Sequence, residues 1–263
     1  MGGAVGRLVR QYKQVNYPPR LLIVVHTCMQ YEESRCKAIL ETWWQKQNDR
    51  ISVSFWTDSP SSFLPSAIYK APYPGGCTYH PSTFKGILDH FKTQESGFDW
   101  FMVVDDDTYV YPDRLLSFLA TVDEGLSLLV GDFINWPLRY PSWRDVYESC
   151  LKKPAPLNYD YRLWPGGGAG LVFSASGVSN VLDMIKELEA DQSTLLAPIN
   201  HDVWLHRIIE EQGASRIARI HCPGFHQFGD RELLPVEKSR PGVLVSVHLN
   251  HDIELMHTFH KLL

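Results

Sequence analysis

Short apolar runs alternate with amphipathic segments along this chain. Residues 21–25 (LLIVV) and 101–104 (FMVV) are continuous apolar runs with the length of buried strands. After the first run, residues 33–46 place apolar side chains at helical spacing, and residues 80–92 show the same pattern with a proline in the first turn. Alternating strands and helices predict an α/β fold with a doubly wound, largely parallel sheet flanked by helices.

The same alternation continues through the second half of the chain. Further strands are predicted at 51–58, 126–132, 168–174 and 243–249. Further helices are predicted at 112–122, 175–190, 200–213 and 252–263. Between these elements, residues 59–77 are rich in Pro, Ser and Gly, and residues 133–164 have no firm periodicity, so both are predicted as loops.

Composition and charge narrow the class of protein. Hydrophobic residues make up 44% of the chain, enough for a substantial core, and no composition break divides it. We therefore predict a short tail at 1–19 and one domain at 20–263. The net charge of −5 and the lack of a basic run argue against nucleic-acid binding. The apolar runs are too short to cross a bilayer.

The N-terminus and the cysteines leave the compartment open. Residues 1–10 lack the apolar region of a signal peptide, which fits either an intracellular protein or a chain trimmed of its targeting segment. The five cysteines are scattered without zinc-site spacing. One or two disulfide bridges are compatible with this number, and an odd count leaves at least one thiol free within the chain.

Three consecutive acids, Asp105, Asp106 and Asp107, follow the apolar run 101–104 directly. Adjacent carboxylates repel one another, and their burial without a positive partner is costly. Ligands of such sheets lie beyond the carboxyl ends of the strands, and clustered carboxylates suit Mn²⁺ or Mg²⁺. The alternative is a solvated acidic turn that caps the helix predicted from Pro112.

Three other features are candidates for the same site. The glycine-rich turn at 164–170 (WPGGGAG) allows a ligand to approach the backbone closely, or it is simply a flexible turn. His226, between two aromatic residues in FHQF, offers a nitrogen ligand for Mn²⁺, although single histidines are more often structural. Asp202 stands in the first turn of a predicted helix, where aspartate usually serves as a cap.

Taken in order, these motifs resemble the β-1,3-glycosyltransferase family that includes the Fringe N-acetylglucosaminyltransferases and the core 1 β-1,3-galactosyltransferase. The resemblance covers roughly residues 20–262. The matching features are Thr27 at a strand end, Arg35 eight residues before the Trp of ETW (41–43), WTDSP (56–60), Lys85, DDDTYV (105–110), GGAG (167–170), His201-Asp202, FHQF (225–228) and SVH (246–248).

The resemblance implies a GT-A fold that binds a UDP-sugar with Mn²⁺ or Mg²⁺. It assigns to the metal Asp107, Asp105 and His226. It places Asp105 and Asp106 at the ribose or at the waters of the metal. It lines the uridine diphosphate with Thr27, Arg35, Asp58 and Lys85. It borders the donor sugar with Gly167, Gly168 and Ala169. It makes Asp202 the catalytic base.

The implied reaction is inverting transfer of a hexose or N-acetylhexosamine to a hydroxyl, O3, of a glycan or glycoprotein acceptor, with Trp136 and Trp164 as candidate acceptor contacts. Relatives are type II membrane proteins of the Golgi, so an anchor would have to lie outside this chain. Asp132 stands where the family often has arginine. Two alternatives remain: a catalytically inactive binding module or chaperone, and a nucleotide-sugar hydrolase.

Overall fold

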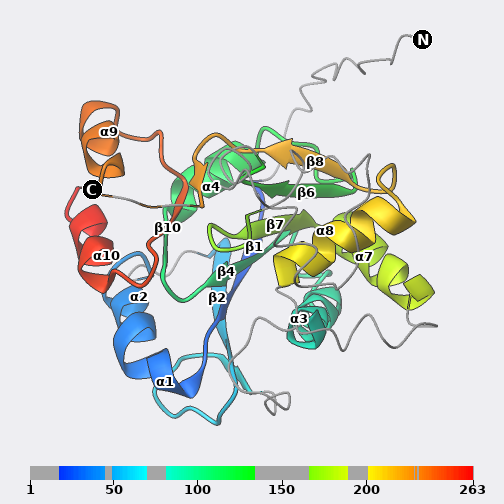
Figure 1. Ribbon diagram of the computed structural model, residues 1–263, viewed down its shortest axis with the longest axis horizontal. Coiled ribbons are helices and arrows are strands. Elements are labelled where there is room, and N and C mark those ends of the chain that lie inside the picture. Colours follow the sequence, from blue (N-terminus) through cyan, green and yellow to red (C-terminus); the bar gives the residue numbers. More distant parts are fainter. Residues whose placement is uncertain are drawn as a thin grey trace, which may run out of the picture.

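The computed structural model describes residues 18–44, 49–69, 81–133, 166–188, 201–227, 229 and 231–262. Its main layer is a seven-stranded sheet in the order β3-β2-β1-β4-β7-β6-β8 (Figure 1). The strands are β1 (Leu21–His26), β2 (Ile51–Thr57), β3 (Ala67–Tyr69), β4 (Trp100–Asp105), β6 (Leu128–Gly131), β7 (Leu171–Ser174) and β8 (Ala218–His221). Only β7 runs antiparallel to its neighbours in this sheet, which confirms the predicted largely parallel α/β fold.

A second, three-stranded sheet lies beyond the end of β4. It contains β5 (Thr108–Val110), β10 (Ser246–His248) and β9 (Phe225–His226), in the order β5-β10-β9. Two residues alone separate β5 from β4, so this sheet begins at the acidic run. The pairing of β10 with β5 brings the C-terminal part of the chain to the acids.

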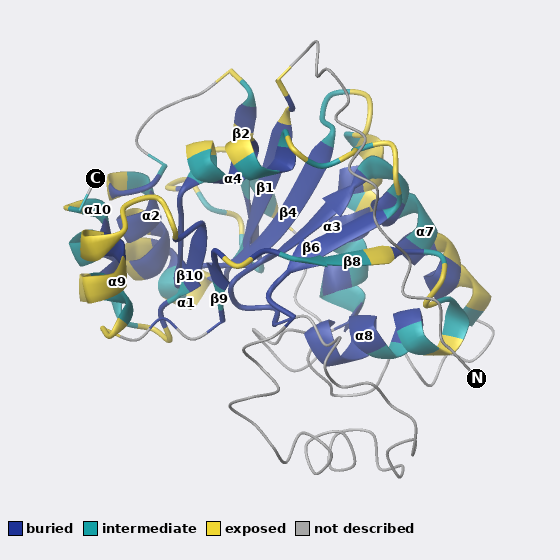
Figure 2. Cartoon of the chain, turned by 90° about the horizontal axis from the view of Figure 1, so that it is seen from above, coloured by how far each residue is buried: buried dark blue, intermediate teal, exposed yellow. Residues whose placement is uncertain are grey.

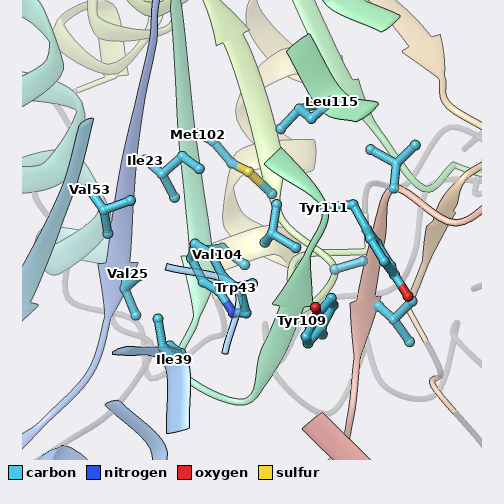
Figure 3. Packing of buried hydrophobic residues seen from close by; sticks show 14 of the residues in the cluster. Ile23, Val25, Ile39, Trp43, Val53, Met102, Val104, Tyr109, Tyr111 and Leu115 are labelled. Carbon is cyan, nitrogen blue, oxygen red and sulfur yellow. The ribbon is translucent and has the colours of Figure 1, made fainter. Parts of the chain in front are cut away.

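Helices cover both faces of the main sheet (Figures 1 and 2). Alternate residues of β1 point to opposite faces, as the geometry of a strand requires. Ile23 and Val25 pack into one hydrophobic cluster with α2 (Lys37–Glu41), α4 (Pro112–Leu119) and α10 (Ile253–His260) (Figure 3). Leu22 and Val24 pack into another with α3 (Pro81–Thr93), α7 (Ala175–Leu188) and α8 (His201–Gln212).

The helix predicted after β1 starts irregularly. A short turn, α1 (Met29–Tyr31), leads into a π-helical turn, η1 (Glu32–Cys36), before α2. Single π-helical turns occur frequently at functional sites, and this one carries Arg35, which is buried. Trp43 follows α2, lies in the core near Val104 (Figure 3), and donates its indole N–H to the carbonyl of Thr108 at 2.9 Å. The ETW motif thus anchors the chain just after the acids.

The structure adds elements that the hydrophobic pattern does not predict. They are β3, β5, β8, β9 and α9 (Leu233–Ser239). The strand predicted over 243–249 is limited to Ser246–His248. In the part of the chain that the structure describes, there is no helix with the length and apolar character needed to cross a membrane.

Candidate active site

The acidic run lies where β4 ends, between the two sheets. Asp105 is the last residue of β4 and lies in register with His26 at the end of β1. All three acids are buried: their exposed fractions are 7% for Asp105, 2% for Asp106 and 0% for Asp107. The solvated-turn alternative therefore does not hold, and each carboxylate needs a partner.

Asp106 is bound by two side chains that the sequence predicted at the nucleotide. Arg35 NH1 donates to Asp106 Oδ1 at 2.9 Å, and Thr27 Oγ1 donates to Asp106 Oδ2 at 2.8 Å. The guanidinium also stacks on Tyr31, with Cζ 3.6 Å from the ring centre. Burial raises the pKa of Asp106, and both partners oppose that rise. Asp106 therefore points toward Arg35 and Thr27, and its expected place at the ribose or at the waters of the metal stays a prediction.

Asp105 and Asp107 form a different group, with His248 of β10. One ligand atom from each of these residues lies within 4.8 Å of the other two. Asp107 Oδ1 is buried and makes no hydrogen bond with the described residues, although His248 Nε2 lies 3.1 Å from it. Two carboxylates and an imidazole suit Mn²⁺. The unsatisfied oxygen and the facing nitrogen fit two ligands of one ion.

The electrostatics of this group reflect its burial and its close neighbours. Burial raises the pKa of Asp105 well above its usual range, and the charges of Asp107 and Asp106 act in the same direction. Burial also opposes the charge of Asp107, but His248 and Arg35 prevail and lower its pKa to about 2. Against burial, Asp107 and Asp105 raise the pKa of His248 to about 9. The imidazolium of His248 thus compensates the acids when no metal is bound.

A strained turn after β10 closes over Asp107. Asn250 and His251 both have positive φ, 49° and 72°, a conformation that is uncommon for residues other than glycine. This turn lets His251 bind Asp107 Oδ2 twice, through its backbone N–H at 3.0 Å and its Nδ1 at 2.6 Å. The imidazole of His251 is 68% exposed, so it covers the acid from the solvent side.

His226, the histidine proposed as a metal ligand, lies on β9 next to β10, paired with Val247. It is not part of the Asp105, Asp107 and His248 group. Burial lowers its pKa, and Asp132 opposes that fall. The candidate group in the structure thus contains His248, while His226 as a metal ligand stays a prediction. The sequence signal was present, because SVH was among the matched motifs.

The glycine turn packs against side chains of the site. A Cβ at Gly167 would lie 3.0 Å from His201 Nε2 and 3.1 Å from Asp202 Cβ, and one at Gly168 would lie 2.7 Å from His248 Nδ1. These glycines therefore give room to protein side chains, rather than only to a ligand as the sequence suggested. Thr108 Oγ1 donates to the carbonyl of Gly168 at 2.7 Å, and Ser246 Oγ donates to that of Ala169 at 2.6 Å.

Asp202 lies across the glycine turn from the acidic run. It is 8% exposed, in the first turn of α8, and its Oδ2 accepts the backbone N–H of Gly167 at 3.4 Å. Its charge raises the pKa of Asp105, so the two carboxylates act on each other electrostatically. His201 stacks on Phe84 of α3, with ring centres 5.0 Å apart, and burial lowers its pKa to about 4. This packing fixes the start of α8.

Of the remaining candidate residues, the structure describes two and leaves out two. Asp58 accepts the backbone N–H of Met29 at 2.8 Å and so lies at the ends of β1 and β2. Lys85 forms an ion pair with Asp89, one turn further along α3, at 3.1 Å. Both remain proposals as nucleotide contacts. The candidate acceptor residues, Trp136 and Trp164, lie outside the described residues.

The fold and the site define a class: a GT-A-type glycosyltransferase fold with an acidic cluster at the end of its central strand. A solved glycosyltransferase involved in glycosylation of the major capsid of PBCV-1 has the same fold, with a TM-score of 0.52 over 93% of this chain and 100% of that one, at 10% identity. The sequence profile of the Fringe-like family matches residues 17–259. The chain belongs to the Fringe-like family.

Several known glycosyltransferases are similar to this chain in sequence. Manic fringe β-1,3-N-acetylglucosaminyltransferase of Danio rerio is 23% identical over 81% of this chain and 57% of its own length. The human manic fringe is 30% identical over 43% of this chain and 38% of its own. Mouse chondroitin sulfate synthase 3 is 28% identical over 91% of this chain. That alignment spans 25% of the synthase, so the chain matches only part of each relative's length.

Proposed function

We propose that this chain is a metal-dependent, inverting glycosyltransferase that uses a UDP-sugar. It transfers a hexose or N-acetylhexosamine to a hydroxyl, O3, of a glycan or glycoprotein acceptor in β linkage. The observation that carries the proposal is that two groups of carboxylates lie beside the same glycine turn, since Gly167 lies against Asp202 and Gly168 lies against His248. Asp105 and Asp107 face His248 on one side, and Asp202 lies across Gly167 on the other. Membership of the Fringe-like family supports the reaction class.

The first requirement of the reaction is neutralisation of the leaving diphosphate. Asp105, Asp107 and His248 are the residues that would hold a divalent cation. A divalent cation held there would supply Lewis-acid chemistry toward the phosphate oxygens. Arg35, 3.8 Å from Asp107 and hydrogen-bonded to Asp106, adds a permanent positive charge beside these acids.

The second requirement is a base for the acceptor hydroxyl. Inverting transfer is a single displacement, in which the hydroxyl loses its proton as its oxygen attacks the anomeric carbon. Asp202 accepts this proton. The backbone N–H of Gly167 holds one carboxylate oxygen of Asp202, and the N–H of Val203 holds the other at 2.7 Å. The carboxylate is thereby fixed in direction, as a general base must be.

The proposal includes action in the lumen of the secretory pathway. Cys28, beside the nucleotide-site Thr27, is disulfide-bonded, while Cys36 and Cys222 are buried free thiols. Disulfides persist in oxidising compartments. This bond supports the Golgi lumen over the cytoplasm.

A donor and acceptor screen tests the proposal. The purified chain is incubated with Mn²⁺, one of UDP-galactose, UDP-N-acetylglucosamine or UDP-glucose, and a panel of glycan acceptors, and NMR reads the anomeric configuration and linkage of the product. We expect a β-linked product with one donor and loss of product with EDTA. Release of free sugar at the same rate without acceptor would indicate a hydrolase. Binding of UDP without turnover of any donor would indicate an inactive binding module.

A further inference from the structure

Gln227, in the FHQF motif, contacts both halves of the candidate site. It is 5% exposed and follows β9 directly. Its carbonyl lies 3.0 Å from His248 Nδ1, on the metal side. Its side-chain Oε1 accepts the backbone N–H of Ala169 at 3.0 Å, on the donor-sugar side. Its own backbone N–H donates to Asp132 Oδ2 at 3.0 Å.

The bond to His248 fixes which ring nitrogen faces the acids. A carbonyl oxygen only accepts, so Nδ1 of His248 carries the hydrogen in this contact. The other nitrogen, Nε2, then points at Asp107 Oδ1, 3.1 Å away. Ligand histidines in metal sites are oriented in this way by a carbonyl or carboxylate at the far nitrogen. The peptide group of Gln227 thus sets the direction of His248.

The side chain of Gln227 lies flat against the glycine turn. A Cβ at Gly166 would lie 2.7 Å from Gln227 Oε1, and a Cβ at Gly168 would lie 2.8 Å from Gln227 Nε2. Both distances are shorter than real Cβ contacts. A side chain at either position would displace this amide, which fills the space beside Gly166 and, together with His248, the space beside Gly168.

Asp132 holds both Gln227 and the glycine turn in place. It is fully buried at the end of β6. Its carbonyl accepts the N–H of Gly166 at 2.9 Å, while its carboxylate accepts the N–H of Gln227. Asp132 thus binds the glycine turn and Gln227 with different groups.

We propose that Gln227 is a positioning residue that couples the metal side of the site to the donor-sugar side, with Asp132 as its anchor. The side-chain amide holds the turn at Ala169, and this contact keeps the peptide that orients His248 in place. Neither residue touches the reacting atoms. The kinetic part of this inference rests on the proposed function, whereas its metal-binding part does not.

The test compares Gln227→Met with wild type and with Gln94→Met, which removes a half-buried amide that donates to Thr93, far from the candidate site in the sequence. Methionine keeps the length of the side chain but cannot accept strongly from Ala169. We expect a fall of about 10-fold in Mn²⁺ affinity by calorimetry without donor, in the range known for residues that support metal ligands. We expect a similar rise in the donor KM, with kcat within a few-fold of wild type. Gln94→Met changes neither.

A second variant guards against simple misfolding. Gln227→Glu keeps an acceptor oxygen for Ala169, so it is expected to recover most of the Mn²⁺ affinity lost in Gln227→Met. A folded Gln227→Met with wild-type Mn²⁺ affinity and donor KM would overturn the inference. So would Gln227→Glu as weak as Gln227→Met. A wild-type chain that binds no Mn²⁺ would overturn both this inference and the proposed function, and wild-type binding with an unaffected Gln227→Met would overturn the inference alone.

Discussion

Replacement of Arg35 tests directly whether its charge stabilises the buried acidic run. The side chains of Arg35 and Asp106 are 9% and 3% exposed, and their ion pair spans 2.9 Å. Arg35→Met keeps most of the apolar volume but leaves Asp106 with Thr27 as its remaining hydrogen-bond donor. Breaking a buried ion pair by removing one partner costs about 3–5 kcal/mol, because the other charge stays buried.

A loss of that size is a large part of a typical stability of about 5–15 kcal/mol. Urea denaturation followed by circular dichroism measures it. Arg231→Met is the matched control, because Arg231 pairs with Asp252 at 3.4 Å and its side chain is 71% exposed. Exposed pairs of this kind contribute about 0–1 kcal/mol.

The double variant Arg35→Met with Asp106→Asn isolates the charge. Without a carboxylate to neutralise, most of the loss should be recovered. The penalty of Arg35→Met alone should also shrink as the pH falls. The pKa of Asp106 is already raised by burial, and without Arg35 the carboxyl takes up a proton more readily in the folded state. A cost below about 1 kcal/mol, or no recovery in the double variant, would refute the reasoning.

Three further predictions follow from the site. Asp202→Asn should bind donor and Mn²⁺ normally but lower kcat by about 10²–10⁴-fold, as loss of a general base does. Asp183→Asn, on the exposed face of α7, is its control, and near-normal turnover by Asp202→Asn would place the base elsewhere. Asp107→Asn should abolish Mn²⁺-dependent UDP binding in calorimetry, and unchanged affinity would remove Asp107 from the metal site. Without metal, the charge of His248 stabilises the fold fully below its unfolded pKa of about 6.5, and this contribution is lost as the pH rises through about 9. Urea denaturation in EDTA at a series of pH values should show this loss of unfolding free energy in wild type and not in His248→Asn. An equal dependence of the unfolding free energy on pH in both proteins would contradict the prediction.

The hydrophobic pattern predicts the inner strands of the main sheet, because most of their residues are buried, but it misses the partly exposed edge strands β3 and β8. Residues 21–25 and 101–104 are continuous apolar runs for this reason. β9 has two residues and β5 has three, so neither is long enough to show a period in the sequence. The pairing of β10 with these short strands is a tertiary contact, and it determines which residues meet at the acids.

That pairing also explains which site residues the sequence could identify. The three acids are contiguous behind a strand, so their chemistry is visible in the sequence. His226 and His248 both stand in short motifs, and only the register of β9 against β10 separates the one beside Asp132 from the one beside Asp107. Gln227 offers no signal of its own, because its role depends on contacts with residues far away in the chain.

The central claim is that a divalent cation binds between the aspartates of the acidic run and His248. A crystal structure of the chain with Mn²⁺ and UDP, with anomalous data collected at the manganese absorption edge, tests it directly. The account predicts one strong anomalous peak in contact with Asp107 and His248, with the diphosphate beside it. A peak at His226 and Asp132, or UDP bound with no peak at the acids, would contradict it.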